Sequence, residues 1–248
     1  MDLGCGNLRM VKNMNLNLKG KNVVITGASS GAGKAAAIAF SNEGANVFLG
    51  ARRLRELEET SLLCGHADIK ELDLSKQKSI TEFCNEVETK FKQVDVLVNS
   101  AAYLLVKPLI DLSLDEWNYT MAVNVSGPFL MYQELYDLFS MNATIVNVSS
   151  IAGVQNIPRF TGFGAYTTSK MALGGLTEMM ATELKAKNVR VNALCPAAID
   201  TPMLKIAIPN LENSKKVNAM TPEKFAEHIL WYASNLSAPA NGQTIILK

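Results

Sequence analysis

The sequence predicts an α/β fold, a doubly wound parallel sheet with helices on both faces. Short runs rich in Val and Ile carry few charges, as expected of strands that are buried on both faces. Longer segments with helical patterns separate these runs, and such alternation is typical of a parallel sheet covered by helices. No internal repeat or Pro/Gly-rich linker divides the chain. We therefore expect a single domain over residues 20–248, preceded by a loosely attached N-terminal extension over residues 1–19.

The apolar runs define the expected strands, and capping residues mark the helices between them. The runs are Asn22–Ile25, Asn46–Leu49, Val94–Val98, Thr144–Val148, Val189–Leu194 and Thr244–Leu247. Gly44 is placed to end the first helix, because glycine is common just after a helix C-terminus. Ser113 and Glu116 have the spacing of a capping box, which predicts a long helix running toward Phe139. Thr221 followed by proline predicts the start of the last helix.

Composition excludes several classes of function. The net charge is +1 and charged residues make up 19% of the chain, so no basic excess indicates nucleic-acid binding. The four cysteines form no CxxC pair and only two histidines are present, so we expect no metal site. No apolar run approaches the ~18 residues that span a bilayer, and the N-terminus lacks the apolar stretch of a signal peptide. We expect a cytoplasmic protein with reduced thiols that acts on small molecules.

A glycine-rich segment, Thr26–Gly33, follows the first expected strand directly, and an Ala-rich helical stretch continues from Lys34. In this strand–turn–helix context the glycines let the backbone approach a pyrophosphate, and the helix N-terminus presents free N–H groups to the anion. The alternative is a tight turn that only packs the helix against the strand. A second glycine string, Asp2–Gly6, is similar to the loop of S-adenosylmethionine methyltransferases. No strand precedes it to orient the backbone, so we disfavour a methyltransferase.

The spacing of the first glycine loop, G-x-x-x-G-x-G, resembles that of the classical short-chain dehydrogenase/reductase family. Five further blocks resemble the family's motifs in the family's order: Val96–Ala102, Asn124–Gly127, Val146–Ser150, Tyr166–Lys170 and Pro196–Thr201. The resemblance covers about residues 20–248, and the ordered set is far more specific than any one block. It implies a single-domain Rossmann-type fold and an oxidoreductase that uses a nicotinamide coenzyme.

Some positions depart from the family pattern. Ser100 and Ala102 replace an Asn and a Gly in the block after the strand, and Ala197 replaces a Gly. We expect the added methyl groups to narrow the floor of the coenzyme site. Ser150 and Tyr166 are also separated by about three residues more than is usual in the family. We expect the additional residues to bulge near Phe160–Phe163.

The resemblance implies that Asn124, Ser150, Tyr166 and Lys170 form the catalytic set. Tyr166 and Lys170 are four residues apart and share a helix face, so the lysine charge is placed to lower the pKa of the tyrosine hydroxyl. Ser150 would bind the substrate oxygen, and Asn124 would hold a water that relays protons. Each residue has an ordinary structural alternative: a solvated Tyr–Lys pair, a serine that caps the next turn, and a satisfied buried amide.

The coenzyme is expected to be NADP(H), with NAD less favoured. Ala51 stands where NAD-dependent members carry an acidic residue, and Arg52 follows it to grip the 2′-phosphate. Arg53 and Ser30 would assist, although Arg53 also fits a solvated residue that starts the next helix. Asp73 would lie against the adenine, or it caps the turn before Ser75. The full set implied to contact the coenzyme is Gly27, Ser29, Ser30, Gly31, Ala32, Arg52, Arg53, Asp73, Leu74, Asn99, Ala101, Tyr166, Lys170, Pro196, Ile199 and Thr201.

These features together predict an NADP(H)-dependent oxidoreductase that interconverts a ketone or aldehyde and an alcohol. The substrate classes left open are 3-oxoacyl thioesters, ketosteroids and general carbonyl compounds or polyols. The irregular segment from Pro202 to Ala219 carries apolar residues, so we expect a mobile lid that favours a partly apolar ketone. Because folds do not fix function, a non-catalytic NADP-binding regulator or scaffold is the alternative. The resemblance also implies a homo-oligomer, a dimer or a tetramer.

Overall fold

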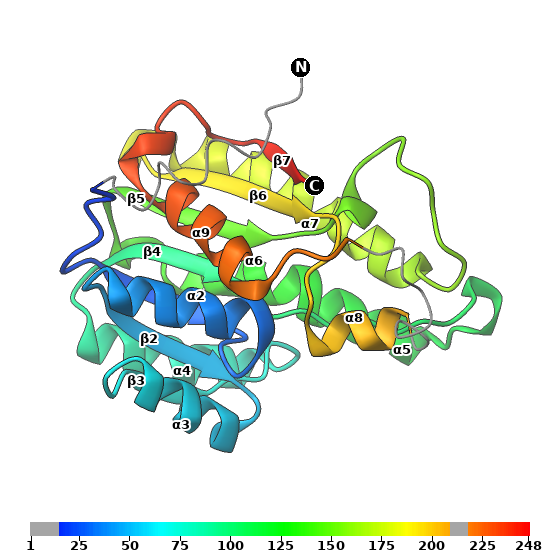
Figure 1. The fold of residues 1–248 in the computed structure, drawn as a ribbon, viewed down its shortest axis with the longest axis horizontal. Helices are drawn as coiled ribbons and strands as arrows, with labels where there is room; N and C mark the ends of the chain where they lie inside the picture. Colours follow the sequence, from blue (N-terminus) through cyan, green and yellow to red (C-terminus); the bar gives the residue numbers. More distant parts are fainter. Residues whose placement is uncertain (1–14, 209–217) are drawn as a thin grey trace.

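The computed structural model describes residues 15–208 and 218–248, and it contains one seven-stranded sheet within them (Figure 1). All strand pairs are parallel, in the order β3-β2-β1-β4-β5-β6-β7. The strands are β1 Asn22–Thr26, β2 Asn46–Ala51, β3 Asp68–Glu71, β4 Val94–Asn99, β5 Phe139–Val148, β6 Arg190–Pro196 and β7 Thr244–Leu247. The order reverses between β1 and β4, which creates a crevice at the carboxyl ends of these strands.

Helices cover both faces of this sheet, as the strand–helix alternation predicts. They are α2 Gly31–Asn42, α3 Leu54–Leu63, α4 Gln77–Lys90, α5 Leu114–Met121, α6 Gly127–Glu134, α7 Gly164–Glu183, α8 Pro202–Ala207 and α9 Pro222–Ala233. Helices α2 and α9 lie side by side on one face in Figure 1. The Rossmann-type doubly wound fold is therefore confirmed.

Alternating strand residues supply the two cores. On β1, Val23 and Ile25 point to the core beneath α2, α3 and α9, whereas Val24 points to the core beneath α4, α6 and α7. All three are fully buried, which explains why these three positions carry apolar side chains. The sheet is thus covered on both faces, which leaves the loops at its edges to form a site.

The expected helix starts are confirmed, but the long helix is interrupted. Ser113 and Glu116 make both hydrogen bonds of a capping box, and the Thr221 hydroxyl accepts from the N–H of Lys224. The helical stretch then passes through a π-helical segment, Ala122–Ser126, between α5 and α6. It ends before Phe139, which begins β5. Single π turns of this kind are frequent at functional sites.

The described end of the N-terminal extension packs more tightly than expected. Leu16 and Leu18 are each 3% exposed and join the core beneath α2 and α9. Their apolar side chains therefore contribute to the fold, which corrects the expectation of loose attachment for residues 16–18. The glycine string Asp2–Gly6 lies outside the described residues. The segment expected to form a lid begins with α8, and its residues 209–217 also lie outside the described part.

Candidate active site

A cleft of about 440 Å³ lies at the carboxyl edge of the sheet. The segments that follow β1, β2, β3, β4, β5 and β6 all contribute to its wall. Sixteen predicted site residues line it: Gly27, Ser29, Ser30, Gly31, Ala32, Arg52, Arg53, Asp73, Leu74, Ala101, Ser150, Tyr166, Lys170, Pro196, Ile199 and Thr201. Residues that are far apart in the sequence therefore meet in one cleft, at the position where open α/β sheets bind ligands.

The glycine loop fits closely between β4 and α2. Gly27 has a φ of +73°, and a Cβ atom there would stand 2.6 Å from the Cα of Ala101. A Cβ on Gly33 would overlap the carbonyl group of Gly27. The N-cap residue of α2, Ser30, makes no side-chain capping bond within the described chain, and the first turn carries no acidic residue. The N–H groups at the start of α2 are consequently available to an anion, which suits the pyrophosphate of a dinucleotide.

Two arginines stand at the end of β2, where the adenosine ribose is expected. Arg53 donates to the hydroxyl oxygens of Ser29 (3.1 Å) and Ser30 (2.7 Å). Arg52 donates to the hydroxyl of Tyr119 over 2.5 Å. Arg53 thus contacts the phosphate loop, while its side chain stays 52% exposed and also approaches Glu56 at 3.7 Å.

Asp73 makes the contacts of its structural alternative, and Asn99 lies away from the wall of the cleft. A carboxylate oxygen of Asp73 accepts from the backbone N–H and the hydroxyl of Ser75, as a turn-capping residue does, although Asp73 also lines the cleft. Asn99 is 2% exposed and donates to the side-chain oxygen of Asn147 over 2.9 Å. Its own side-chain oxygen is buried and has no partner in the described chain. Asn99 therefore lies beneath the cleft and not on its wall.

The proposed proton donor, Tyr166, lies inside the cleft on the first turn of α7. Ser150 follows β5 and lines the cleft together with Tyr166. The hydroxyl oxygen of Ser150 accepts from the backbone N–H of Ala152, so the capping alternative also holds. Lys170 lies one turn after Tyr166, is 2% exposed, and places Nζ 5.7 Å from the centre of the tyrosine ring. Strand and helix thus bring three predicted catalytic residues together.

Burial dominates the acid–base properties of this pair. It raises the pKa of Tyr166 to about 12, and the nearby Ser150 side chain works in the opposite direction. It lowers the pKa of Lys170 to about 8. The pKa of Tyr166 therefore lies above the ordinary tyrosine value, whereas the sequence predicted that Lys170 would lower it. The ammonium group is instead directed at the backbone, where it donates to the carbonyl of Val148.

Asn124 sits in the π-helical segment and does not line the cleft. Its side-chain oxygen accepts from the N–H of Tyr103, and its Nδ2 donates to the carbonyl of Tyr103 and to the hydroxyl of Ser169. At 1% exposure the amide is thus fully satisfied by protein groups. The side chain links the loop after β4 to the catalytic helix, which is a different task from the expected water relay.

Sequence reasoning missed the apolar part of the wall. Phe163, Leu104, Met203 and Leu204 line the cleft but were not among the candidate residues. Phe163 is the N-cap residue of α7, and its ring centre lies 6.3 Å from that of Tyr166. The signal for it was present, because it belongs to the stretch of additional residues between Ser150 and Tyr166.

Comparison with known proteins decides the family. Residues 21–211 match the short chain dehydrogenase family. The chain belongs to this family. A 3-oxoacyl-[acyl-carrier-protein] reductase from Thermotoga maritima is 34% identical to this short-chain dehydrogenase over 93% of its chain and 97% of the relative. A 3beta-hydroxysteroid dehydrogenase from Eggerthella lenta is 32% identical, over 93% of each chain.

A solved structure agrees with these relatives. A variant of a Serratia marcescens short-chain dehydrogenase/reductase superposes on this short-chain dehydrogenase with a TM-score of 0.84 at 25% identity, covering 93% of this chain and 97% of the other. Within residues 15–208 and 218–248, no group of three or more His, Cys, Asp or Glu side chains is arranged to hold a metal ion. No helix in the same ranges is long and apolar enough to cross a membrane.

Proposed function

We propose that this short-chain dehydrogenase is an NADP(H)-dependent oxidoreductase that interconverts a ketone or aldehyde and an alcohol, with Tyr166 as its acid/base. The observation that carries the proposal is that Ser150 and Tyr166 line the same cleft, with Lys170 buried beside them. A surface Tyr–Lys pair, the structural alternative, would leave both side chains in solvent. Here both are more than nine-tenths buried.

Each of the three residues has a task in this reaction. Reduction of a carbonyl requires a proton on its oxygen, and the Tyr166 hydroxyl is the donor that faces the cleft. Ser150 donates a hydrogen bond to the same oxygen and stabilises charge that develops there. The Lys170 charge stabilises the phenolate left after proton transfer, because an opposite charge nearby favours the ionised form. When bound, the nicotinamide ring supplies or accepts the hydride.

The wall of the cleft fits a dinucleotide. The uncapped start of α2 offers backbone N–H groups to the pyrophosphate. Ala51, Arg52 and Arg53 follow one another at the end of β2, so no carboxylate there opposes a 2′-phosphate. A guanidinium can grip that phosphate with two charge-assisted hydrogen bonds. These features support NADP(H) over NAD as the coenzyme.

The regulator alternative and the substrate classes call for a direct assay. A panel of ketones and alcohols, including 3-oxoacyl thioesters, steroids and polyols, is incubated with each coenzyme while absorbance of the reduced nicotinamide is followed. Turnover that prefers NADP(H) supports the proposal. Tight coenzyme binding without turnover of any member would favour a non-catalytic regulator. Assembly as a dimer or tetramer and a cytoplasmic location stay predictions, to be checked by light scattering and fractionation.

A further inference from the structure

The loop between β5 and α7 carries a pair of phenylalanines, Phe160 and Phe163. The ring centres of Phe160 and Phe163 lie 5.8 Å apart, and Phe163 lies next to Tyr166. Only Phe163 lines the cleft, whereas Phe160 is 69% exposed. The two phenylalanines therefore share a loop but differ in access to the reacting centre.

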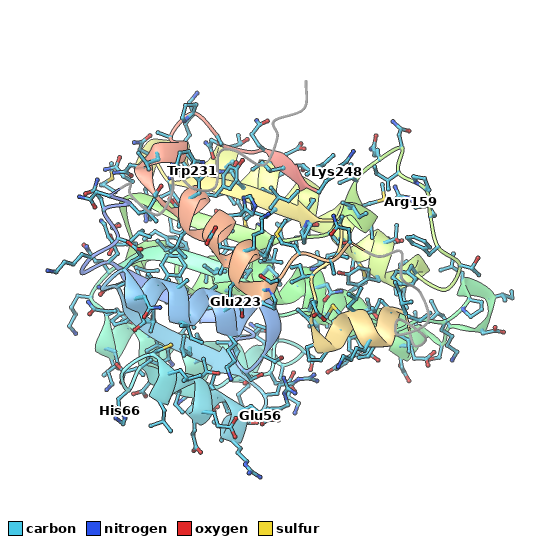
Figure 2. The ribbon with its side chains drawn as sticks, in the orientation of Figure 1. Glu56, His66, Arg159, Glu223, Trp231 and Lys248 are labelled. Atoms are coloured by element: carbon cyan, nitrogen blue, oxygen red, sulfur yellow. The ribbon has the colours of Figure 1, made fainter. Side chains whose placement is uncertain are left out.

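This loop is anchored to the rest of the molecule. Arg159, which Figure 2 labels on the loop, donates to the carbonyl oxygens of Ala152 and Val154. On the other side, the carbonyl of Gly162 accepts from the N–H of Lys107 over 2.8 Å. Contacts at both ends hold the following residue, Phe163, at a fixed position as the cap of α7.

The wall around Phe163 is apolar. Leu104 comes from the loop after β4, and Met203, Leu204 and Ala207 come from α8. Among the described residues of the wall, the charged side chains are Arg52, Arg53, Asp73 and Lys170. Three of these lie at the ends of β2 and β3, and Lys170 donates to the protein backbone. The part of the wall near Phe163 therefore presents no charge to a substrate substituent within the described chain.

We propose that Phe163 determines specificity, by packing against an apolar, uncharged aryl or similarly bulky substituent of the ketone or alcohol. Its ring is edge-on to that of Tyr166, with an angle of 83° between the planes, so a substituent on the carbonyl held by Tyr166 would meet the Phe163 ring. Aromatic contacts of this kind add to the effect of the buried area itself. This inference rests on the proposed function and names the substrate class of the same site.

The test compares Phe163→Ala with Phe160→Ala as the matched control on the same loop. Binding of acetophenone, acetone and 4-acetylbenzoate to the complex with oxidised coenzyme is measured by calorimetry. A ketone and oxidised coenzyme cannot react, so affinity is measured apart from turnover. Reduction of the same ketones with reduced coenzyme gives kcat/KM. We expect Phe163→Ala to lower both the affinity for acetophenone and its kcat/KM about tenfold. Both quantities should stay within about twofold of wild type for acetone. Phe160→Ala should leave affinity and kcat/KM unchanged for both ketones. The wild-type enzyme should bind and reduce acetophenone better than 4-acetylbenzoate.

Three results would overturn the inference: an equal loss for acetone and acetophenone, an equal loss in Phe160→Ala, or a preference for 4-acetylbenzoate. Absence of ketone binding to the wild-type complex would also overturn it. Selective binding that depends on Phe163, without turnover of any ketone, would leave the inference standing and contradict the proposed function. Ketone turnover that is unaffected by Phe163→Ala would support the proposed function and contradict the inference. Phe163→Leu keeps an apolar side chain and serves as a second variant in case Phe163→Ala does not fold. Its acetophenone affinity and kcat/KM should lie between those of Phe163→Ala and wild type.

Discussion

The ammonium group of Lys170 donates to the backbone carbonyl of Val148 over 2.8 Å. This contact joins the catalytic helix α7 to the end of β5, two residues before Ser150. Because Lys170 is buried, its charge is taken out of water, and this desolvation lowers its pKa to about 8. The cleft therefore holds a cation that opposes folding at neutral pH and lies 5.7 Å from the centre of the Tyr166 ring.

The depressed pKa of Lys170 predicts an unusual pH dependence of stability. Between about pH 8 and the ordinary lysine pKa, the unfolded chain binds a proton that the folded chain has released, so stability rises with pH. We expect the free energy of unfolding of wild type, relative to Lys170→Met, to increase by about 1 kcal/mol between pH 8 and pH 9. Urea denaturation at both pH values measures this difference. A constant difference would show that Lys170 titrates normally.

The two arginines after β2 predict coenzyme choice. Arg52→Ala and Arg53→Ala should each lower the ratio of kcat/KM for NADPH to that for NADH by roughly 10–100-fold, the value of a charged hydrogen bond. Arg55→Ala is the matched control, because Arg55 lies nearby on α3 and its side chain is 90% exposed. Ala51→Asp with Arg52→Leu should move the preference toward NAD. Assays need a fixed ionic strength, since salt screens phosphate binding.

A wild-type enzyme that uses both coenzymes equally would contradict the NADP(H) proposal. If Arg52→Ala lowers the NADPH/NADH ratio of kcat/KM and Arg53→Ala does not, Arg52 is the main ligand of the 2′-phosphate, as the sequence predicts. In the structure it is Arg53, and not Arg52, that hydrogen-bonds Ser29 and Ser30 of the glycine loop.

The close packing of the glycine loop predicts opposite effects of two Gly→Ala changes. In Gly33→Ala the new methyl group overlaps the Gly27 carbonyl, so the loop must shift and coenzyme affinity should fall at least tenfold. In Gly175→Ala, within α7, the methyl group meets nothing within 4 Å. That variant should gain about 0.5–1 kcal/mol of stability and bind coenzyme normally. Coenzyme fluorescence titration and urea denaturation distinguish the two, and normal coenzyme affinity in Gly33→Ala would refute the tight fit.

The sequence was informative where local patterns determine structure. Val/Ile runs located six of the seven strands to within a few residues, apart from the early start of β5 at Phe139. No such run marked β3, because its sequence Asp-Ile-Lys-Glu is mostly charged, whereas Ser113 and Thr221 marked helix starts correctly. Motif order also placed Ser150, Tyr166 and Lys170 in one cleft, because carboxyl ends of parallel strands meet at one edge of the sheet.

Other features depend on tertiary contacts that no local pattern records. The direction of the Tyr166 pKa follows from how completely the fold buries its hydroxyl. The partners of Asn124 come from the loop after β4 and from α7, and no spacing rule names them. Leu16 and Leu18 are likewise buried because they contact the core beneath α2 and α9, which comes together only in the folded chain.

In the proposed reaction, Tyr166 transfers the proton. Tyr166→Phe removes only the hydroxyl and keeps the ring that packs near Phe163 and Lys170. General acid–base catalysis typically contributes ~10²–10⁴-fold. A control titration of the variant with NADPH should give a dissociation constant within about twofold of wild type.

The decisive measurement is single-turnover reduction of the best ketone by this variant at saturating NADPH. Single turnover excludes product release, so the rate reports on the chemical step. We predict a rate at least ~10²-fold below wild type with coenzyme affinity preserved. A folded Tyr166→Phe enzyme that reduces the ketone at the wild-type rate would show that Tyr166 does not transfer the proton.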